Sequence, residues 1–170
     1  FWDGTAWSQI PNIIATPGMA IGANSQFTAR LGGRAVMGRT AAPAGTTYTW
    51  LPISGSHDFN DPSKWSPARN TAFTTDILQF SSGGTSTAIN VPTQTVTRVL
   101  VSGSTDISLQ SNAAATFTIN GPTATTNLSI ASGSNLQVSN NASTTTLLLN
   151  FGATTGQLGN IAGTLRVNLN

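Results

Sequence analysis

The chain has 170 residues, of which only 7% are charged, and its formal net charge at pH 7 is +2. It contains 27 Thr, 18 Ser and 15 Asn, but a single Lys and no Glu. Long helices draw on Glu, Lys and Arg at exposed positions, whereas Thr favours strands. The composition therefore argues against long helices and predicts an all-β protein with a neutral polar surface. Because the chain has no Cys, disulfides and thiolate metal sites are excluded.

The charge balance and hydropathy also bear on partners and location. A surface of hydroxyls and amides is usual for extracellular bacterial β-proteins, so we expect the chain to be secreted or displayed on a bacterial cell surface. Seven basic residues against five Asp do not form the concentrated basic face of a nucleic-acid binder. No apolar run approaches the length of a membrane span. We therefore expect neither a nucleic-acid partner nor membrane insertion of this segment.

Residues 1–45 are predicted to be a β-hairpin-rich N-terminal region. The segment opens with Phe1–Trp7, in which an Asp-Gly pair at positions 3 and 4 lies between short aromatic stretches. Asp-Gly is a preferred pair for a tight hairpin turn because both residues tolerate positive φ. A second hairpin is expected around Gly32 and Gly33.

Residues 46–95 are predicted to form a cap module that leads into the repeats that follow. A Thr-x-Trp strand is followed by an Asn/Asp-rich turn, a Trp-Ser-Pro step and a strand pattern that starts at Asp76. This arrangement resembles the module that opens large secreted or surface bacterial β-helix proteins, the Bacteroidetes-type or autotransporter-like adhesins. The resemblance covers residues 46–82, departs from the pattern at Lys64, where Asn is common, and implies architecture rather than a ligand. The matching residues are Thr49, Trp50, Asn60, Asp61, Trp65, Ser66, Pro67 and Asp76.

Residues 96–170 carry a repeating pattern of short strands. Apolar-polar-apolar triplets start about every 8 to 11 residues, with Gly, Asn and Ser between them. Such strands either pair as hairpins in an antiparallel β-sandwich or stack as coils of a parallel β-helix (β-solenoid). The short strands and the corner-like segment Ile130–Val138 favour the solenoid, with the antiparallel sandwich as the alternative. Coils of roughly 20 residues would give three to four turns in this half.

The ends of the sequence suggest a fragment. The chain begins at Phe1 without an initiator Met or a signal-peptide pattern, and it stops within the alternating segment Leu165–Asn170. We therefore expect the remainder of a longer chain to adjoin this segment. An open last coil would need further coils or a cap to bury its edge.

The segment around His57 contains the residues with the clearest potential for acid–base or metal chemistry. Asp58, Asn60 and Asp61 are a candidate set for calcium, which binds oxygen ligands. The spacing does not match an EF-hand, and no second His accompanies His57. The favoured interpretation is a polar turn in which Asp58 or Asp61 accepts hydrogen bonds from backbone N–H groups.

Two further groups of residues could contact ligands. Trp2 and Trp7 are candidates for stacking on sugar rings, because an indole offers a large apolar face. Trp50 and Trp65 are instead expected to be core or cap residues of the solenoid. The densest basic cluster flanks the second predicted hairpin and is interpreted as rim charge that keeps a sheet edge soluble. It consists of Arg30, Arg34 and Arg39.

The distribution of charge argues against an enzyme. The span Ile107–Leu165 contains no ionisable side chain, so general acid–base catalysis has no groups to use there. We expect no cofactor and no catalytic residue. The predicted function is a structural or adhesive segment that acts as a stiff scaffold, with a surface glycan or another cell-surface protein as partner. The alternatives are a non-catalytic part of a carbohydrate-active β-helix enzyme or of a phage tail fibre.

Overall fold

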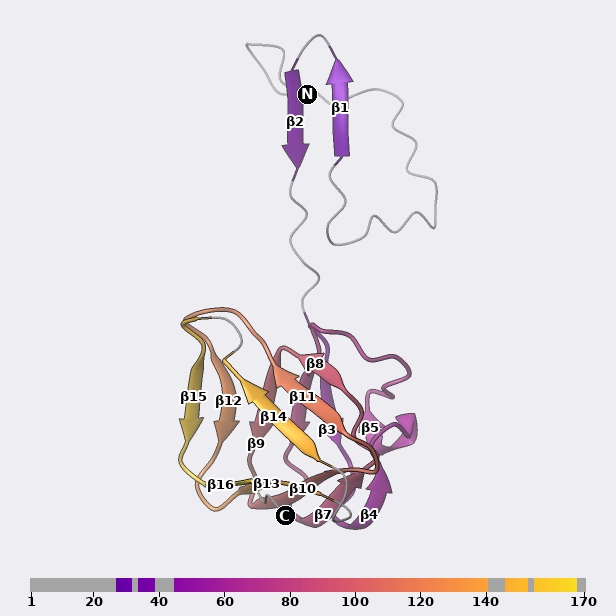
Figure 1. The fold of residues 1–170 in the computed structure, drawn as a ribbon, viewed down its shortest axis with the longest axis vertical. Helices are drawn as coiled ribbons and strands as arrows, with labels where there is room; N and C mark the ends of the chain where they lie inside the picture. Colours follow the sequence, from indigo (N-terminus) through magenta and orange to yellow (C-terminus); the bar gives the residue numbers. More distant parts are fainter. Residues whose placement is uncertain (1–26, 32–33, 39–44, 141–145, 153–154, 168–170) are drawn as a thin grey trace. The chain divides into compact units, whose positions relative to one another are not determined.

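The structure is a computed structural model that describes residues 27–31, 34–38, 45–140, 146–152 and 155–167 (Figure 1). The chain divides into two compact units, Phe1–Ala44 and Gly45–Asn170. In the first unit the described residues form one antiparallel hairpin, in which β1 (Phe27–Leu31) pairs with β2 (Arg34–Gly38). The hairpin predicted around Gly32 and Gly33 is confirmed. The one predicted at Asp3 and Gly4 lies outside the described residues.

The second unit is a parallel β-solenoid of about four turns between residues 47 and 167. In its described part the only helical element is the short 3-10 turn η1 (Pro62–Lys64). The strands are β3 (Thr47–Trp50), β4 (Ser54–Asp58), β5 (Trp65–Ser66), β6 (Ile77–Phe80), β7 (Gly84–Ile89), β8 (Gln94–Val96), β9 (Arg98–Val101), β10 (Thr105–Ser111), β11 (Ala115–Ile119), β12 (Thr126–Ile130), β13 (Asn135–Asn140), β14 (Leu147–Phe151), β15 (Leu158–Ile161) and β16 (Thr164–Val167).

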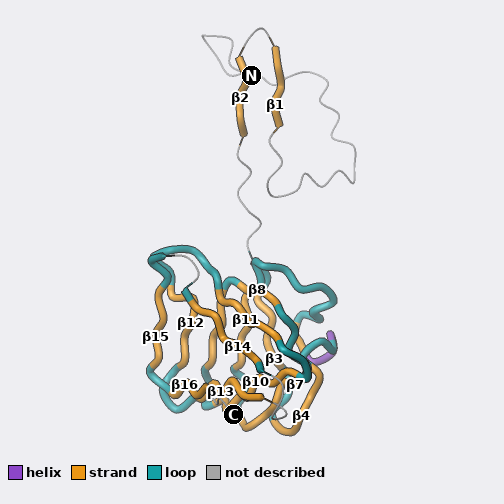
Figure 2. The backbone as a smooth tube through the Cα atoms, viewed as in Figure 1, coloured by secondary structure: helices purple, strands orange, loops and turns teal. Residues whose placement is uncertain are grey.

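These strands form three sheets that run along the solenoid axis. The first sheet has the order β15-β12-β9-β6-β3-β5, the second β16-β13-β10-β7-β4 and the third β14-β11-β8. Successive coils place one strand in each sheet, so that β9, β10 and β11 make one coil and β12, β13 and β14 make the next (Figure 1). Figure 2 shows that the loops gather where the chain passes from one sheet to the next.

Alternation of apolar and polar residues in each strand creates the core. In β10 the burial alternates residue by residue, with Ile107 and Leu109 fully buried and Ser108 between them part-exposed. Parallel pairing in register stacks inward residues of one coil on those of the next, as for Leu78, Val99 and Leu128. The result is a set of apolar rows along the axis, and in this row Leu78 and Val99 are 0% and Leu128 is 1% exposed. Deleting such a residue would cost roughly 2–5 kcal/mol.

Pairing of the strands decides between the two architectures that the sequence left open. Strand β10 pairs in parallel with both β7 and β13, and β11 pairs in parallel with β8 and β14. An antiparallel sandwich would require hairpins between residues 107 and 149, so that alternative is wrong. The solenoid is confirmed.

The coils differ in length from one another. The pairing of Leu78 with Val99 encloses a coil of 21 residues, but that of Val99 with Leu128 encloses one of 29. The first of these coils matches the expected length of about 20 residues and the second is longer, so residues 96–167 hold fewer than the expected three to four turns. The solenoid also starts earlier than residue 96, since β3 and β6 already pair in parallel.

The N-terminal end of the solenoid is closed by a cap. Strand β5 pairs antiparallel with β3, opposing Trp65 to Trp50, and so covers the outer edge of the first sheet. The two indoles meet edge to face with centroids 4.9 Å apart, and Phe59 and Phe80 pack against them. Trp50 is 0% and Trp65 2% exposed, which confirms the expectation that both are core or cap residues.

The corners stack on one another along the axis. At the turn from the first to the second sheet, backbone hydrogen bonds link successive coils, from the Ala131 amide to the Val101 carbonyl (2.8 Å) and from the Ala162 amide to the Ile130 carbonyl (2.9 Å). Gly133 adopts a φ of +77°, a conformation that favours glycine. The predicted corner Ile130–Val138 is therefore confirmed.

Candidate functional site

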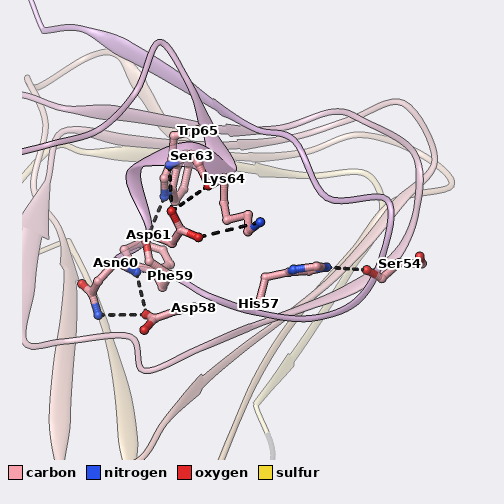
Figure 3. A network of polar contacts seen from close by, with 9 residues as sticks. All are labelled: Ser54, His57, Asp58, Phe59, Asn60, Asp61, Ser63, Lys64 and Trp65. Carbon is pink, nitrogen blue, oxygen red and sulfur yellow. Dashed lines mark hydrogen bonds and ion pairs between the residues drawn. The ribbon is translucent and has the colours of Figure 1, made fainter.

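The polar turn that follows β4 is the first candidate site, and Figure 3 shows it from close by. The Asp58 carboxylate accepts hydrogen bonds from the backbone amide (2.9 Å) and the side-chain amide (3.3 Å) of Asn60. The Asp61 carboxylate accepts from the amide (2.9 Å) and hydroxyl (2.7 Å) of Ser63, which caps η1. These are the local contacts by which Asx residues stabilise turns. The structure therefore agrees with the polar-turn interpretation.

The charge of Asp61 is stabilised by its neighbours. Hydrogen bonds from the hydroxyl and amide of Ser63, and the positive charge of Lys64, hold the pKa of Asp61 below its ordinary value. The Lys64 ammonium lies 3.7 Å from Oδ2 of Asp61 at an exposed position. Such a pair contributes little to stability because water and salt screen it.

The calcium candidates share this turn, where each of them contacts other protein groups. Asp58 and Asp61 each bind groups of the turn itself, while the side-chain amide of Asn60 donates to the Asn90 carbonyl (2.8 Å). Within the described part of the chain, no group of three or more His, Cys, Asp or Glu side chains could hold a metal ion. The arrangement can thus order a corner without any ion.

His57 does not join the carboxylates. Its Nε2 atom lies 2.8 Å from the carbonyl oxygen of Ser54 and therefore donates a hydrogen bond to it (Figure 3). The ring belongs to β4, which pairs only with β7 among the described strands and is the outermost strand of the second sheet. The His57 side chain thus hydrogen-bonds a backbone carbonyl at the exposed edge of the sheet. Unpaired backbone groups at such an edge can pair with a strand of another molecule.

Behind the cap lies a buried ionic cluster that the sequence pattern did not reveal. The Arg69 Nε atom donates to Oδ2 of Asp76 at 2.9 Å, and the two side chains are 5% and 1% exposed. The Arg69 Nη2 atom also donates to the Gln94 side chain (2.9 Å). The guanidinium carbon lies between 5.6 and 5.8 Å from the ring centroids of Tyr48, Phe59 and Trp65.

This cluster holds the cap to the solenoid and is closed to ligands. The aromatic rings contact the positive charge of the guanidinium, and the buried Asp76 carboxylate accepts a hydrogen bond from it. Oδ2 of Asp76 also accepts a hydrogen bond from the Phe73 amide (3.0 Å), which anchors the loop before β6. A sequence signal did exist, since Asp76 directly precedes an apolar strand, but nothing in the sequence indicates that Arg69 is its partner.

The outward face of the second sheet is the second candidate site. Parallel pairing lines up its outward residues in two rows of hydroxyl and amide side chains, which we call the hydroxyl–amide face. Neighbouring strands of a sheet lie about 4.8 Å apart, so each row repeats polar groups at that spacing. The face consists of Ser54, Thr85, Asp106, Asn135 and Thr164 in one row and Ser56, Thr87, Ser108, Gln137 and Arg166 in the other.

Several residues that the sequence singled out cannot be placed. Trp2 and Trp7, the candidates for sugar stacking, and Arg39 lie outside the described residues. Arg30 and Arg34 occupy paired strands of the β1–β2 hairpin, where they flank its turn as expected. Among the described residues no helix is long and apolar enough to cross a bilayer.

The chain matches no protein-family model, and no curated protein or solved structure matches it. The β-solenoid fold is thus shown by the strand pairing alone.

Proposed function

We propose that this chain is a structural and adhesive segment of a secreted or cell-surface bacterial protein, in which the solenoid is a stiff scaffold. The observation that carries the proposal is the unbroken parallel pairing of the second sheet, from β4 through β7, β10 and β13 to β16. Every coil is hydrogen-bonded to its neighbours in this way. A rod built so resists bending and exposes few loops to proteases.

The proposal assigns no catalytic role. It is supported by the dispersal of the ionisable side chains of the described residues. Asp76 is buried against Arg69, and the Asp58 and Asp61 carboxylates bind groups of their own turn. Asp106 occupies an outward position of β10 beside Thr85 and Asn135. Glycoside hydrolysis typically uses two carboxyl groups that flank one glycosidic bond.

The proposed partner is a neutral surface glycan, with a cell-surface protein as the other candidate. The hydroxyl–amide face supports this because it offers neutral donors and acceptors in regular rows, and sugars bind through hydroxyl groups of the same chemistry. Asp106 and Arg166 are its only charged members, and they lie in different rows. Trp2 and Trp7 remain a second hypothesis for sugar stacking.

A glycan-binding experiment tests the adhesive role. The full chain would be applied to immobilised neutral polysaccharides, beside the variants Thr87→Lys and Ser108→Lys on the hydroxyl–amide face and the double variant Trp2→Ala, Trp7→Ala. We expect retention that the two lysine substitutions reduce at least tenfold. The matched control is Thr49→Lys, which changes an outward residue of the first sheet.

The outcomes separate the parts of the proposal. Loss of retention only in the tryptophan double variant would move the binding site to the N-terminal region. Absence of retention on every glycan and every cell surface tested would overturn the adhesive role. Limited proteolysis tests the scaffold role, since rapid cleavage within residues 47–140 would contradict a stiff rod.

A further inference from the structure

The corner between the third and the first sheet contains the only Asn-Gly pair of the sequence, Asn120 and Gly121. Asn120 follows β11 and is exposed to water. Its backbone amide donates to the Val96 carbonyl (2.8 Å), which joins this corner to the preceding coil. The pair is chemically reactive, because glycine has no side chain to keep the asparagine carboxamide away from the next backbone nitrogen.

The packing of the coils requires glycine at position 121. An added Cβ would collide with the side-chain oxygen of Asn127 and with the backbone carbonyl of Thr97. Asn127 is 0% exposed, and its side-chain nitrogen donates to the Pro122 carbonyl (3.0 Å), so its side chain is fixed in place. The fold therefore retains a reactive Asn-Gly pair at a corner that water can reach.

A side chain from the next coil holds the groups on both sides of the Gly121 nitrogen. Gln157 directly precedes β15, and its Nε2 atom donates to Oδ1 of Asn120 (2.6 Å) and to the Gly121 carbonyl (3.0 Å). The carboxamide of Asn120 must turn toward the Gly121 nitrogen before it can react with it. Both hydrogen bonds from Gln157 oppose this rotation, because one fixes the carboxamide and the other fixes the backbone that follows the nitrogen.

We propose that Asn120 is a site of spontaneous deamidation and that Gln157 sets its rate by restraining the carboxamide. The Gly121 nitrogen forms a bond to Cγ of Asn120 and gives up its proton, while the bond from Cγ to the side-chain nitrogen breaks and ammonia leaves. Water then opens the cyclic imide at one of its two carbonyls, which yields aspartate or isoaspartate. The inference does not depend on the adhesive role.

The two products differ in their effect on the corner. Aspartate at position 120 leaves the backbone unchanged and still accepts the hydrogen bond from Gln157. Isoaspartate routes the backbone through the side chain and so adds one methylene between the amide that binds Val96 and the nitrogen of Gly121. Gly121 then loses its place against Thr97, and the contact between the coils at this corner opens.

The full chain is incubated at mildly alkaline pH, both folded and in urea, and peptide mass spectrometry follows aspartate and isoaspartate at residue 120. We expect the folded natural chain to react more slowly than the chain in urea. Gln157→Met keeps the length of the side chain but removes the donor, and should accelerate the folded reaction roughly tenfold or more, since two hydrogen bonds are lost. The matched control is Gln79→Met, because Gln79 donates to Ser81 in the first sheet, and it should leave the rate unchanged.

Equal rates in the natural and Gln157→Met chains, each shown to be folded by circular dichroism, would overturn the role of Gln157. If Gln157→Met does not fold, the natural chain decides alone, and equal rates with and without urea would overturn it. Modification of other asparagines while Asn120 stays intact would overturn the assignment of the site.

Discussion

The indole Nε1 atom of Trp50 donates a hydrogen bond of 3.2 Å to the hydroxyl of Ser86 inside the solenoid. Trp50 is 0% and Ser86 2% exposed. Ser86 occupies an inward position, in a row that continues with Ile107 and Leu136. One hydroxyl therefore replaces an apolar side chain in the core because the indole above it needs an acceptor.

Ser86→Ala should destabilise the chain by about 1–3 kcal/mol, because the buried Trp50 N–H then lacks a partner. Urea denaturation followed by tryptophan fluorescence measures this. Ser56→Ala is the matched control, since Ser56 is an exposed outward residue of the neighbouring strand β4. Equal midpoints for the two variants would show that the hydrogen bond contributes nothing.

Removal of Arg69 should lower the free energy of unfolding more than Ser86→Ala does. Arg69→Met leaves the Asp76 carboxylate buried without its cation, for which we expect a loss of about 3–5 kcal/mol in the free energy of unfolding. The double variant Arg69→Met, Asp76→Leu should recover part of this loss, because both charges are then absent. Lys64→Met, at the exposed pair with Asp61, should leave the denaturation midpoint nearly unchanged.

Gly84 tests the close approach of two coils. It has a φ of +71°, and a Cβ at this position would collide with the carbonyl oxygen of Ile53. Gly152 has a φ of +79° with nothing within 4 Å of an added Cβ. Gly152→Ala should therefore cost about 1–2 kcal/mol from the backbone alone. Gly84→Ala should cost at least about 3 kcal/mol, and similar thermal midpoints for the two would contradict the packing described.

A ladder of Asn side chains stabilises the corner between the second and third sheets. Asn60 donates to the Asn90 carbonyl, and Asn112 donates to the Asn90 side-chain oxygen. Asn90 itself has a φ of +61°. Asn90→Gly keeps the carbonyl that accepts from Asn60 and should lose only the hydrogen bond from Asn112, about 1 kcal/mol. Asn90→Ala should lower the free energy of unfolding by about 2 kcal/mol, because alanine adds the strain of a positive φ. A lower melting temperature for the glycine variant than for the alanine variant, measured by calorimetry, would refute this.

The lowered pKa of Asp61 gives a prediction about pH. Its ordinary value is 3.8, and the folded chain holds it lower. Ionised Asp61 thus favours the folded state above pH 3.8, and this contribution is lost as the pH falls through the folded pKa. Ser63→Ala removes the largest cause and should raise the pKa toward 3.8. A carbon-detected NMR titration of the Asp61 carboxyl would show this, and an unchanged titration would exclude the Ser63 hydroxyl as the cause.

The sequence was sufficient to predict the solenoid because its signal is local. Alternation within β10 and the Gly and Ser residues of the corner after Ile130 are visible in short windows. Coil length was not predictable in the same way. It depends on which strands share a sheet, and the 21 residues from Leu78 to Val99 show no feature that distinguishes one coil from two hairpins.

The candidate site was only partly predictable. The turn contacts of Asp58 and Asp61 follow from short-range Asx preferences. The Arg69–Asp76 pair does not, because the sequence does not distinguish a buried charged residue from an exposed one. The tertiary fold determines which residue lies next to it. The hydroxyl–amide face was likewise invisible, since its rows combine residues from five strands.

The unequal coils have a consequence for how this architecture can change. What stays constant between coils is the position of each strand in its row, while the corners absorb the difference between 21 and 29 residues. An insertion at a corner therefore leaves the neighbouring coils in register, whereas one within a strand would turn its apolar residues outward. Corners can thus acquire or lose surface loops independently of one another, so new recognition elements can evolve at one level of the rod without disturbing the rest.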